Sequence, residues 1–84
     1  MSLKLNDNQL AVLNSGERVR TLAVWIIGRR DNRYALQVCE QLSIKQVENP
    51  GDTAITRMIG YLRSDKCDTG IVARLINAHQ HATR

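Results

Sequence analysis

The fold is decided by residues 17–29, which read ERVRTLAVWIIGR. Apolar residues recur in this stretch at the spacing i, i+3, i+4, i+7, which is the period of one face of an α-helix. The members of this stripe are Val19, Leu22, Ala23, Ile26 and Ile27. Val24 and Trp25 add apolar surface beyond the stripe. The helix is therefore predicted to lie at the centre of its domain or to take part in an oligomer contact.

The same stretch has a second interpretation as one arm of a β-hairpin. Residues 22–27 are rich in β-branched and aromatic side chains, and residues 30–33 can form a loop into a second strand over residues 34–38. The alternative fold is therefore α+β, with a hairpin around residues 19–38. We favour the helix because the match to the helical period is complete.

Four further segments are predicted to be helical. They cover residues 8–14, residues 33 to about 46, a segment that begins at Asp52 and a segment that begins at Asp68. The last three carry apolar stripes: Ala35, Val38, Cys39 and Leu42 in the first, Ile55, Met58, Ile59 and Leu62 in the second, and Val72, Leu75, Ile76 and either Ala78 or His79 in the third. The strongest break in the chain is residues 49–51, Asn-Pro-Gly, which contain its only proline.

Polar residues with capping side chains precede each helical segment. Asp7 is the predicted cap of the first helix, and Asn14 stands three residues before Glu17, the spacing of a capping box. Asp31 or Asn32 is the predicted cap of the third helix, and Asp52 is the predicted cap of the fourth. Loops of two to six residues between helices are typical of a bundle in which neighbouring helices pack in sequence order.

The length and composition predict one compact all-α domain of four or five helices over residues 1–84, with a short polar tail from about residue 80. The composition is 43% hydrophobic and 24% charged, which argues against intrinsic disorder. A chain of 84 residues buries only about 60–65% of the surface that it exposes when unfolded. Its stability margin is therefore thin, and a second subunit in a dimer would add to it.

The cysteines and the apolar runs predict a cytoplasmic protein with reduced thiols. Two cysteines do not make a disulfide framework, and Cys39 lies in an apolar stripe, where it is expected to be a small buried hydrophobic residue. Polar residues interrupt the segment 3–13, so it does not resemble a secretory signal. The longest apolar run, residues 22–27, is far shorter than the ~20 residues that span a bilayer, and no membrane partner is expected.

The sequence contains few of the residue patterns that are typical of an enzyme or of a metal site. The five glycines are dispersed and form no phosphate-binding loop. A catalytic pair of Cys67 with His79 or His81 would need a third group to orient the histidine, and the sequence indicates none. A zinc site made from these residues and Cys39 would lack the closely spaced ligand pairs that are typical of such sites. We therefore expect no catalysis, no metal, no cofactor and no small-molecule substrate.

Basic residues outnumber acidic ones by twelve to eight, which gives a net charge of +4 and is compatible with an anionic partner. Arg29, Arg30 and Arg33 flank a predicted turn in which Asp31 is the only acidic residue, and there they can contact phosphates together. The alternative is that the first two lie in the last turn of a helix and offset the negative end of its dipole. Aromatic residues are too few for a protein that stacks bases.

The helix that begins at Asp52 is a second candidate for nucleic-acid contact. Its outward side is predicted to show short polar groups, arginines and a tyrosine: Thr53, Thr56, Arg57, Gly60, Tyr61 and Arg63. A recognition helix needs such residues and no carboxylate, so residues 35–42 and this helix are candidates for a helix-turn-helix variant. The segment 43–51 is longer than the usual turn, and Gly60 costs about 1 kcal/mol in a helix.

The sequence therefore predicts a small non-enzymatic regulatory protein that binds DNA as a dimer. The residues assigned to nucleic acid are those of the basic helix and the arginine cluster: Arg29, Arg30, Arg33, Thr53, Thr56, Arg57, Tyr61 and Arg63. The alternative is a protein-interaction module, an adaptor or inhibitor, that docks through Val24, Trp25 and Tyr34. Trp, Tyr and Arg are enriched at the centres of protein interfaces, which favours this second interpretation.

Overall fold

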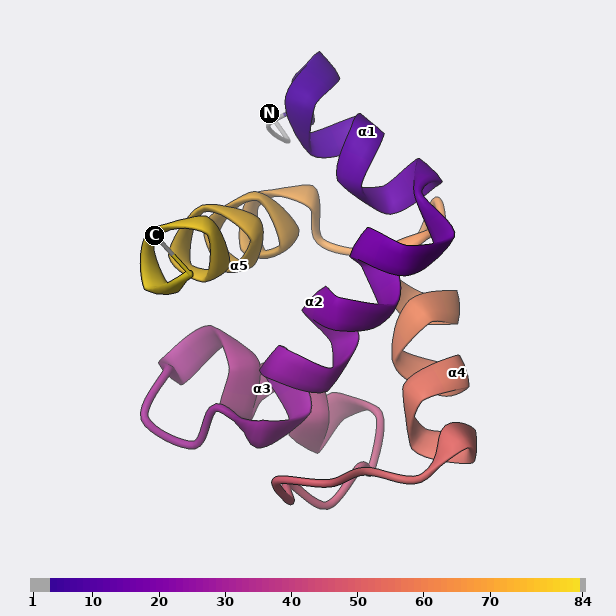
Figure 1. The fold of residues 1–84 in the computed structure, drawn as a ribbon, viewed down its shortest axis with the longest axis vertical. Helices are drawn as coiled ribbons and strands as arrows, with labels where there is room; N and C mark the ends of the chain where they lie inside the picture. Colours follow the sequence, from indigo (N-terminus) through magenta and orange to yellow (C-terminus); the bar gives the residue numbers. More distant parts are fainter. Residues whose placement is uncertain (1–3, 84) are drawn as a thin grey trace.

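A computed structural model describes residues 4–83 as a bundle of five helices (Figure 1). They are α1 (Asp7–Asn14), α2 (Gly16–Gly28), α3 (Arg33–Gln41), α4 (Asp52–Leu62) and α5 (Thr69–Ala82). No strand occurs in the described range, so the predicted all-α bundle is confirmed and the hairpin around residues 19–38 is wrong. A helix can turn the whole stripe of residues 17–29 to one side, whereas a strand would alternate these residues between two faces.

The helix α2 is the centre of the bundle, because it contacts each of the other four helices. Figure 1 shows α2 crossing the middle of the molecule, with α4 on one side and α5 on the other. All five members of its stripe are at most 1% exposed: Val19, Leu22, Ala23, Ile26 and Ile27. The central position predicted for this helix is confirmed.

The stripes of the other helices also point inward, with small differences at their edges. Leu42, Ile59, Ala78 and His79 are half-buried rather than buried. Cys39 is buried, as its place in the stripe of α3 predicts. Within residues 4–83, no helix has both the length and the apolar composition that crossing a membrane requires.

The capping residues differ from the predicted ones at three helices, α1, α2 and α4. Asn6 caps α1 and forms a capping box with Gln9, so Asp7 is the first helical residue and not the cap. Ser15 caps α2 and accepts a hydrogen bond from the amide of Arg18 at 3.2 Å, in the place predicted for Asn14. Asn14 is the last residue of α1, and Ser15 alone separates it from the start of α2 at Gly16.

The later helices begin close to their predicted starts. Asn32 caps α3 and accepts hydrogen bonds from the amides of Tyr34 and Ala35. The N-cap of α4 is Gly51, without a side-chain hydrogen bond, so Asp52 is the first helical residue and not the predicted cap. Asp68 caps α5 and accepts from the amide of Ile71. The helix α5 continues to Ala82, further than the tail predicted from about residue 80, and Arg84 lies outside the described residues.

The helix α3 ends at Gln41, five residues before the end predicted near residue 46. Ser43 has a φ of 55°, and the amide of Ile44 then donates back to the carbonyl of Cys39 at 2.8 Å. This turn buries Ile44 and releases the chain from the helix. The side-chain amide of Gln46 then donates to the carbonyls of Ile26 and Arg29, which ties the connection to the end of α2.

Candidate nucleic-acid interface

The ring of Tyr34, in the first turn of α3, lies beneath two guanidinium groups. The Cζ atom of Arg33 lies 5.5 Å from the centre of the ring, and that of Arg74 on α5 lies 5.4 Å from it. The ring is half-buried, whereas both arginines are exposed. Arg74 also donates to the carbonyl of Gly70 at 3.3 Å. Tyr34 therefore brings together two cationic groups from two different helices.

Trp25, near the end of α2, has a similar environment. The Cζ atom of Arg29 lies 5.4 Å from the ring of Trp25, and the ring of His79 on α5 lies 5.3 Å away at an interplanar angle of 50°. Burial lowers the pKa of His79 below its ordinary value of 6.5, which favours the neutral imidazole at neutral pH. The helix α5 thus contacts the aromatic side chains of both α2 and α3.

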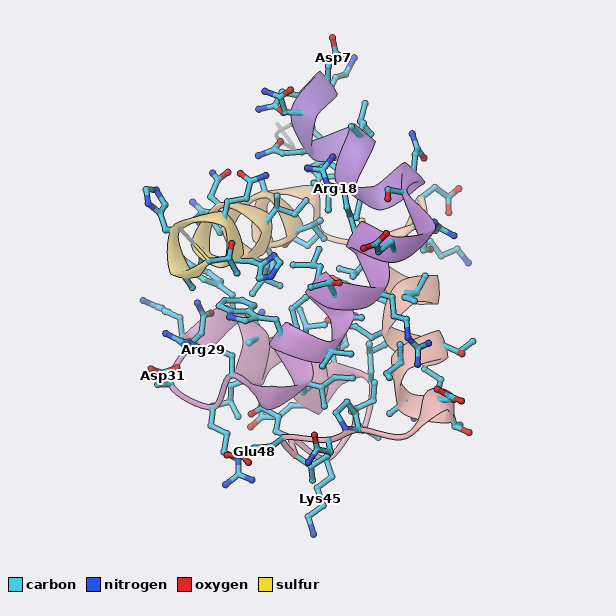
Figure 2. All side chains as sticks on the ribbon, viewed as in Figure 1. Asp7, Arg18, Arg29, Asp31, Lys45 and Glu48 are labelled. Carbon is cyan, nitrogen blue, oxygen red and sulfur yellow. The ribbon has the colours of Figure 1, made fainter. Side chains whose placement is uncertain are left out.

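The turn between α2 and α3, residues 29–32, carries two further arginines. Arg29 forms an ion pair with Asp31 at 2.9 Å, but both side chains are largely exposed, so the pair is weak. Arg30 is exposed next to it. Figure 2 shows Arg29 and Asp31 at this turn, well away from Arg18 at the start of α2. We call the four arginines Arg29, Arg30, Arg33 and Arg74 the arginine surface.

The outward residues of α4 are of two kinds: exposed threonines, and side chains that form hydrogen bonds with other parts of the chain. Thr53 and Thr56 are exposed. The other three polar residues that were assigned to nucleic acid bond within the chain. Arg57 donates to the carbonyl of Leu42, Arg63 donates through Nε to the carbonyl of Leu13, and the Tyr61 hydroxyl accepts from the amide of Asp68. These side chains fasten α4 to its neighbours.

The start of α4 also carries an acidic group. Asp52, in the first turn, pairs with Arg20 on α2 at 2.7 Å, and its side chain is 85% exposed. The ten residues 42–51 separate α3 from α4, and both helices pack on α2. The pair α3–α4 therefore lacks the short turn of a helix-turn-helix.

The residues assigned to a protein interface are Val24, Trp25 and Tyr34. All three are half-buried and pack against the core. Guanidinium groups lie over the two aromatic rings, so neither ring is a bare apolar surface.

The cysteine and histidine considered for catalysis lie at different cavities. Cys67 lines a cavity of about 300 Å³ with Leu10 and Leu13. His79 lines another, of about 210 Å³, with Glu17 and Arg18. In the part of the chain that the structure describes, no group of three or more His, Cys, Asp or Glu side chains is placed to hold a metal ion.

Two residues of this region escaped the sequence-based prediction. Arg74 lies outside the stripe of α5, but nothing in the sequence shows that α5 passes beside Tyr34, forty residues earlier in the chain. Leu36 lies on the outward side of α3 and is 43% exposed. Its position between Ala35 and Val38, outside their stripe, was the available signal.

The chain matches no known family, and no similar curated protein or solved structure is found.

Proposed function

We propose that the protein binds double-stranded DNA by contacting phosphates with the arginine surface. The observation that carries this proposal is that Arg33 of α3 and Arg74 of α5 each lie within 5.5 Å of the centre of the Tyr34 ring. The two arginines of the turn that precedes α3, Arg29 and Arg30, are also exposed, in a chain whose net charge is +4. The acidic residue of the turn, Asp31, offsets only part of this charge.

Arginine is well suited to this role. The guanidinium group is planar, always charged and able to bond two phosphate oxygens at once. A contact with an aromatic face restricts the side chain before the ligand arrives, so less conformational entropy is lost on binding. Arg29 over Trp25, and Arg33 and Arg74 over Tyr34, have such contacts.

The environment of the aromatic rings favours a duplex over a single strand. Proteins that bind single strands without sequence preference offer open aromatic faces on which bases stack. Trp25 and Tyr34 are half-buried beneath guanidinium groups, and the Tyr61 hydroxyl accepts a hydrogen bond in the connection that follows α4. A regular row of phosphates therefore fits the arginine surface better than unstacked bases do.

A small domain that binds DNA is suited to a regulatory role, and we include that role in the proposal. Thr53 and Thr56 are exposed on α4, but they are not part of the arginine surface and have no role in this proposal. Arg57, Tyr61 and Arg63 serve the fold in this proposal, since each has a partner within the chain.

The protein-interaction alternative stays a prediction, and one observation favours it. Leu10 is 41% exposed and lines the cavity of about 300 Å³ together with Leu5, Leu13 and Leu62. An apolar side chain of a partner protein would fit there. This surface differs from the one predicted around Trp25.

The proposal is tested by fluorescence anisotropy of a labelled random-sequence duplex at several salt concentrations. The wild type should bind with a dissociation constant of roughly 1–100 μM that rises steeply with salt. The double variant Arg33→Ala/Arg74→Ala should bind more weakly and lower the slope of log K against log salt by about 2.

The matched control is the double variant Arg18→Ala/Lys45→Ala. It removes the same charge from two exposed positions that Figure 2 shows away from Arg29. The control should keep most of the salt slope. A wild type that binds no duplex at low salt, or equal losses in the two double variants, would overturn the proposal.

A further inference from the structure

The helices α2 and α3 form a pair with the connection of a helix-turn-helix. The helix α2 ends at Gly28, α3 begins at Arg33, and four residues join them. The two helices pack against each other, and in Figure 1 the ribbon of α3 crosses that of α2 instead of running alongside it. Helix-turn-helix units have a turn of three or four residues, often with a glycine, between two crossing helices.

The outer face of α3 is uncovered. Its exposed residues follow the spacing i, i+3, i+4, i+7, i+8 and are Arg33, Leu36, Gln37, Glu40 and Gln41. The opposite face, made by Ala35, Val38 and Cys39, is at most 1% exposed. Leu36 and Leu10 are the large hydrophobic residues exposed on the described surface, and Leu36 lies in the middle of this face.

The chemistry of this face matches the edges of base pairs. Arginine bonds the N7 and O6 atoms of guanine, and glutamine bonds adenine through N6 and N7. A glutamate accepts from the amino group of cytosine, and an apolar side chain contacts the methyl group of thymine. Arg33, Leu36 and Gln37 lie in the first half of α3, the part of a recognition helix that contacts bases.

The arginine surface lies around the start of this face. Arg29 and Arg30 are in the turn that precedes α3, and Arg74 reaches the ring of Tyr34 from α5. Cationic groups beside the leading end of a helix meet the phosphates on either side of a groove. The carboxylates near this face are Asp31, which pairs with Arg29 in the turn, and Glu40 on the face itself.

We infer that α3 is the helix that enters the major groove, and that Leu36 and Gln37 determine its sequence preference. This inference rests on the proposed function. It adds the helix that contacts the base pairs and a preference of the protein for a particular DNA sequence. It transfers the recognition role from α4, where the sequence placed it, to α3.

The test is a selection of bound duplexes from a random-sequence library, made with the wild type, Gln37→Ala and Thr56→Ala. Gln37 and Thr56 are both exposed, on α3 and α4 respectively, so neither substitution opens a cavity in the core. Anisotropy then measures the affinity for the enriched duplex and for a scrambled duplex. Circular dichroism checks that both variants remain folded.

The wild type should enrich a defined site. Gln37→Ala should lose the preference at one base pair and bind the enriched duplex about 5- to 100-fold more weakly, with little change on the scrambled duplex. Thr56→Ala should behave as the wild type.

Three outcomes would overturn the inference while the proposed function stands. They are binding without an enriched site, a preference that Gln37→Ala leaves unchanged, and a preference that changes only with Thr56→Ala. A wild type that binds neither duplex at low salt overturns the proposed function itself.

Discussion

The guanidinium carbon of Arg74 lies 5.4 Å from the centre of the Tyr34 ring, and this contact joins α5 to the first turn of α3. Arg33 lies over the same ring at 5.5 Å. Tyr34 is therefore a positioning residue for two arginines of the surface proposed to bind phosphates. A cation over an aromatic face at an exposed site gains about 0.5–1 kcal/mol.

Replacing Tyr34 by leucine should weaken duplex binding, because the two guanidinium groups lose the face that restricts them. We expect Tyr34→Leu to raise the dissociation constant about 2- to 5-fold, the equivalent of one such contact. Tyr34→Phe keeps the aromatic face and should bind within about 2-fold of the wild type. Anisotropy at low salt measures both variants, and equal affinities for leucine and phenylalanine would contradict the role of the ring.

The stability of the bundle should depend on the stripe of α2. Leu22 is buried at the centre, so Leu22→Ala should lower the free energy of unfolding by about 2–5 kcal/mol. Leu36 is 43% exposed, so Leu36→Ala should change it by no more than about 0.5 kcal/mol. Both variants replace leucine by alanine, so the size of the removed group is the same. Urea denaturation followed by circular dichroism measures the free energy of unfolding of each. Equal effects would mean that α2 is not the centre of the core.

The contrast between these two leucines shows what the sequence can predict. Leu22 belongs to a helical stripe, and this pattern is local, so the chain reveals which face of α2 is buried. The end of α3 is different, because it depends on the burial of Ile44 and on the bonds from Gln46 to Ile26 and Arg29. These contacts join residues up to twenty positions apart, which periodicity does not detect.

The candidate site follows the same division. Arg29, Arg30 and Arg33 were predicted together because they are neighbours in the chain. Arg74 was missed because its place beside Tyr34 depends on how α5 packs in space. Arg57 was predicted to face outward, and it is exposed, but its guanidinium group bonds the carbonyl of Leu42. A sequence pattern predicts which side of a helix a residue lies on, but it does not predict which group a long side chain such as that of Arg57 will bond.

The start of α5 should depend on its cap. The carboxylate of Asp68 accepts from the amide of Ile71 at 3.2 Å, so Asp68→Ala should lower the free energy of unfolding by about 1 kcal/mol. Asp65→Ala removes the same charge from the connection before α5 and serves as the control, with an expected change within about 0.5 kcal/mol. Urea denaturation checks both, and a larger loss in Asp65→Ala would place the stabilising carboxylate elsewhere.

The two cysteines should differ in reactivity. Cys39 is buried, and this burial raises its pKa from 9.0 to about 11, so its thiolate is scarce at pH 8. Burial also raises the pKa of Cys67, but this residue is half-buried at the connection between α4 and α5. Iodoacetamide at pH 8 should alkylate Cys67 in the native protein and Cys39 only after urea is added. Mass spectrometry of peptides identifies the site, and rapid labelling of native Cys39 would contradict its burial.

The stability of the protein should fall as the pH decreases through 6.5, in part because of His79. Burial against Trp25 lowers the pKa of His79, so near its ordinary pKa of 6.5 the unfolded chain binds more protons than the folded one. Acidification therefore favours unfolding in this range, although Glu17 and Arg18 line the same cavity as the imidazole. His79→Gln removes the titrating group and should show a smaller loss of stability between pH 7.5 and pH 5.5 than the wild type. Urea denaturation at the two pH values measures this difference, and an equal loss in both proteins would show that His79 is not the group responsible.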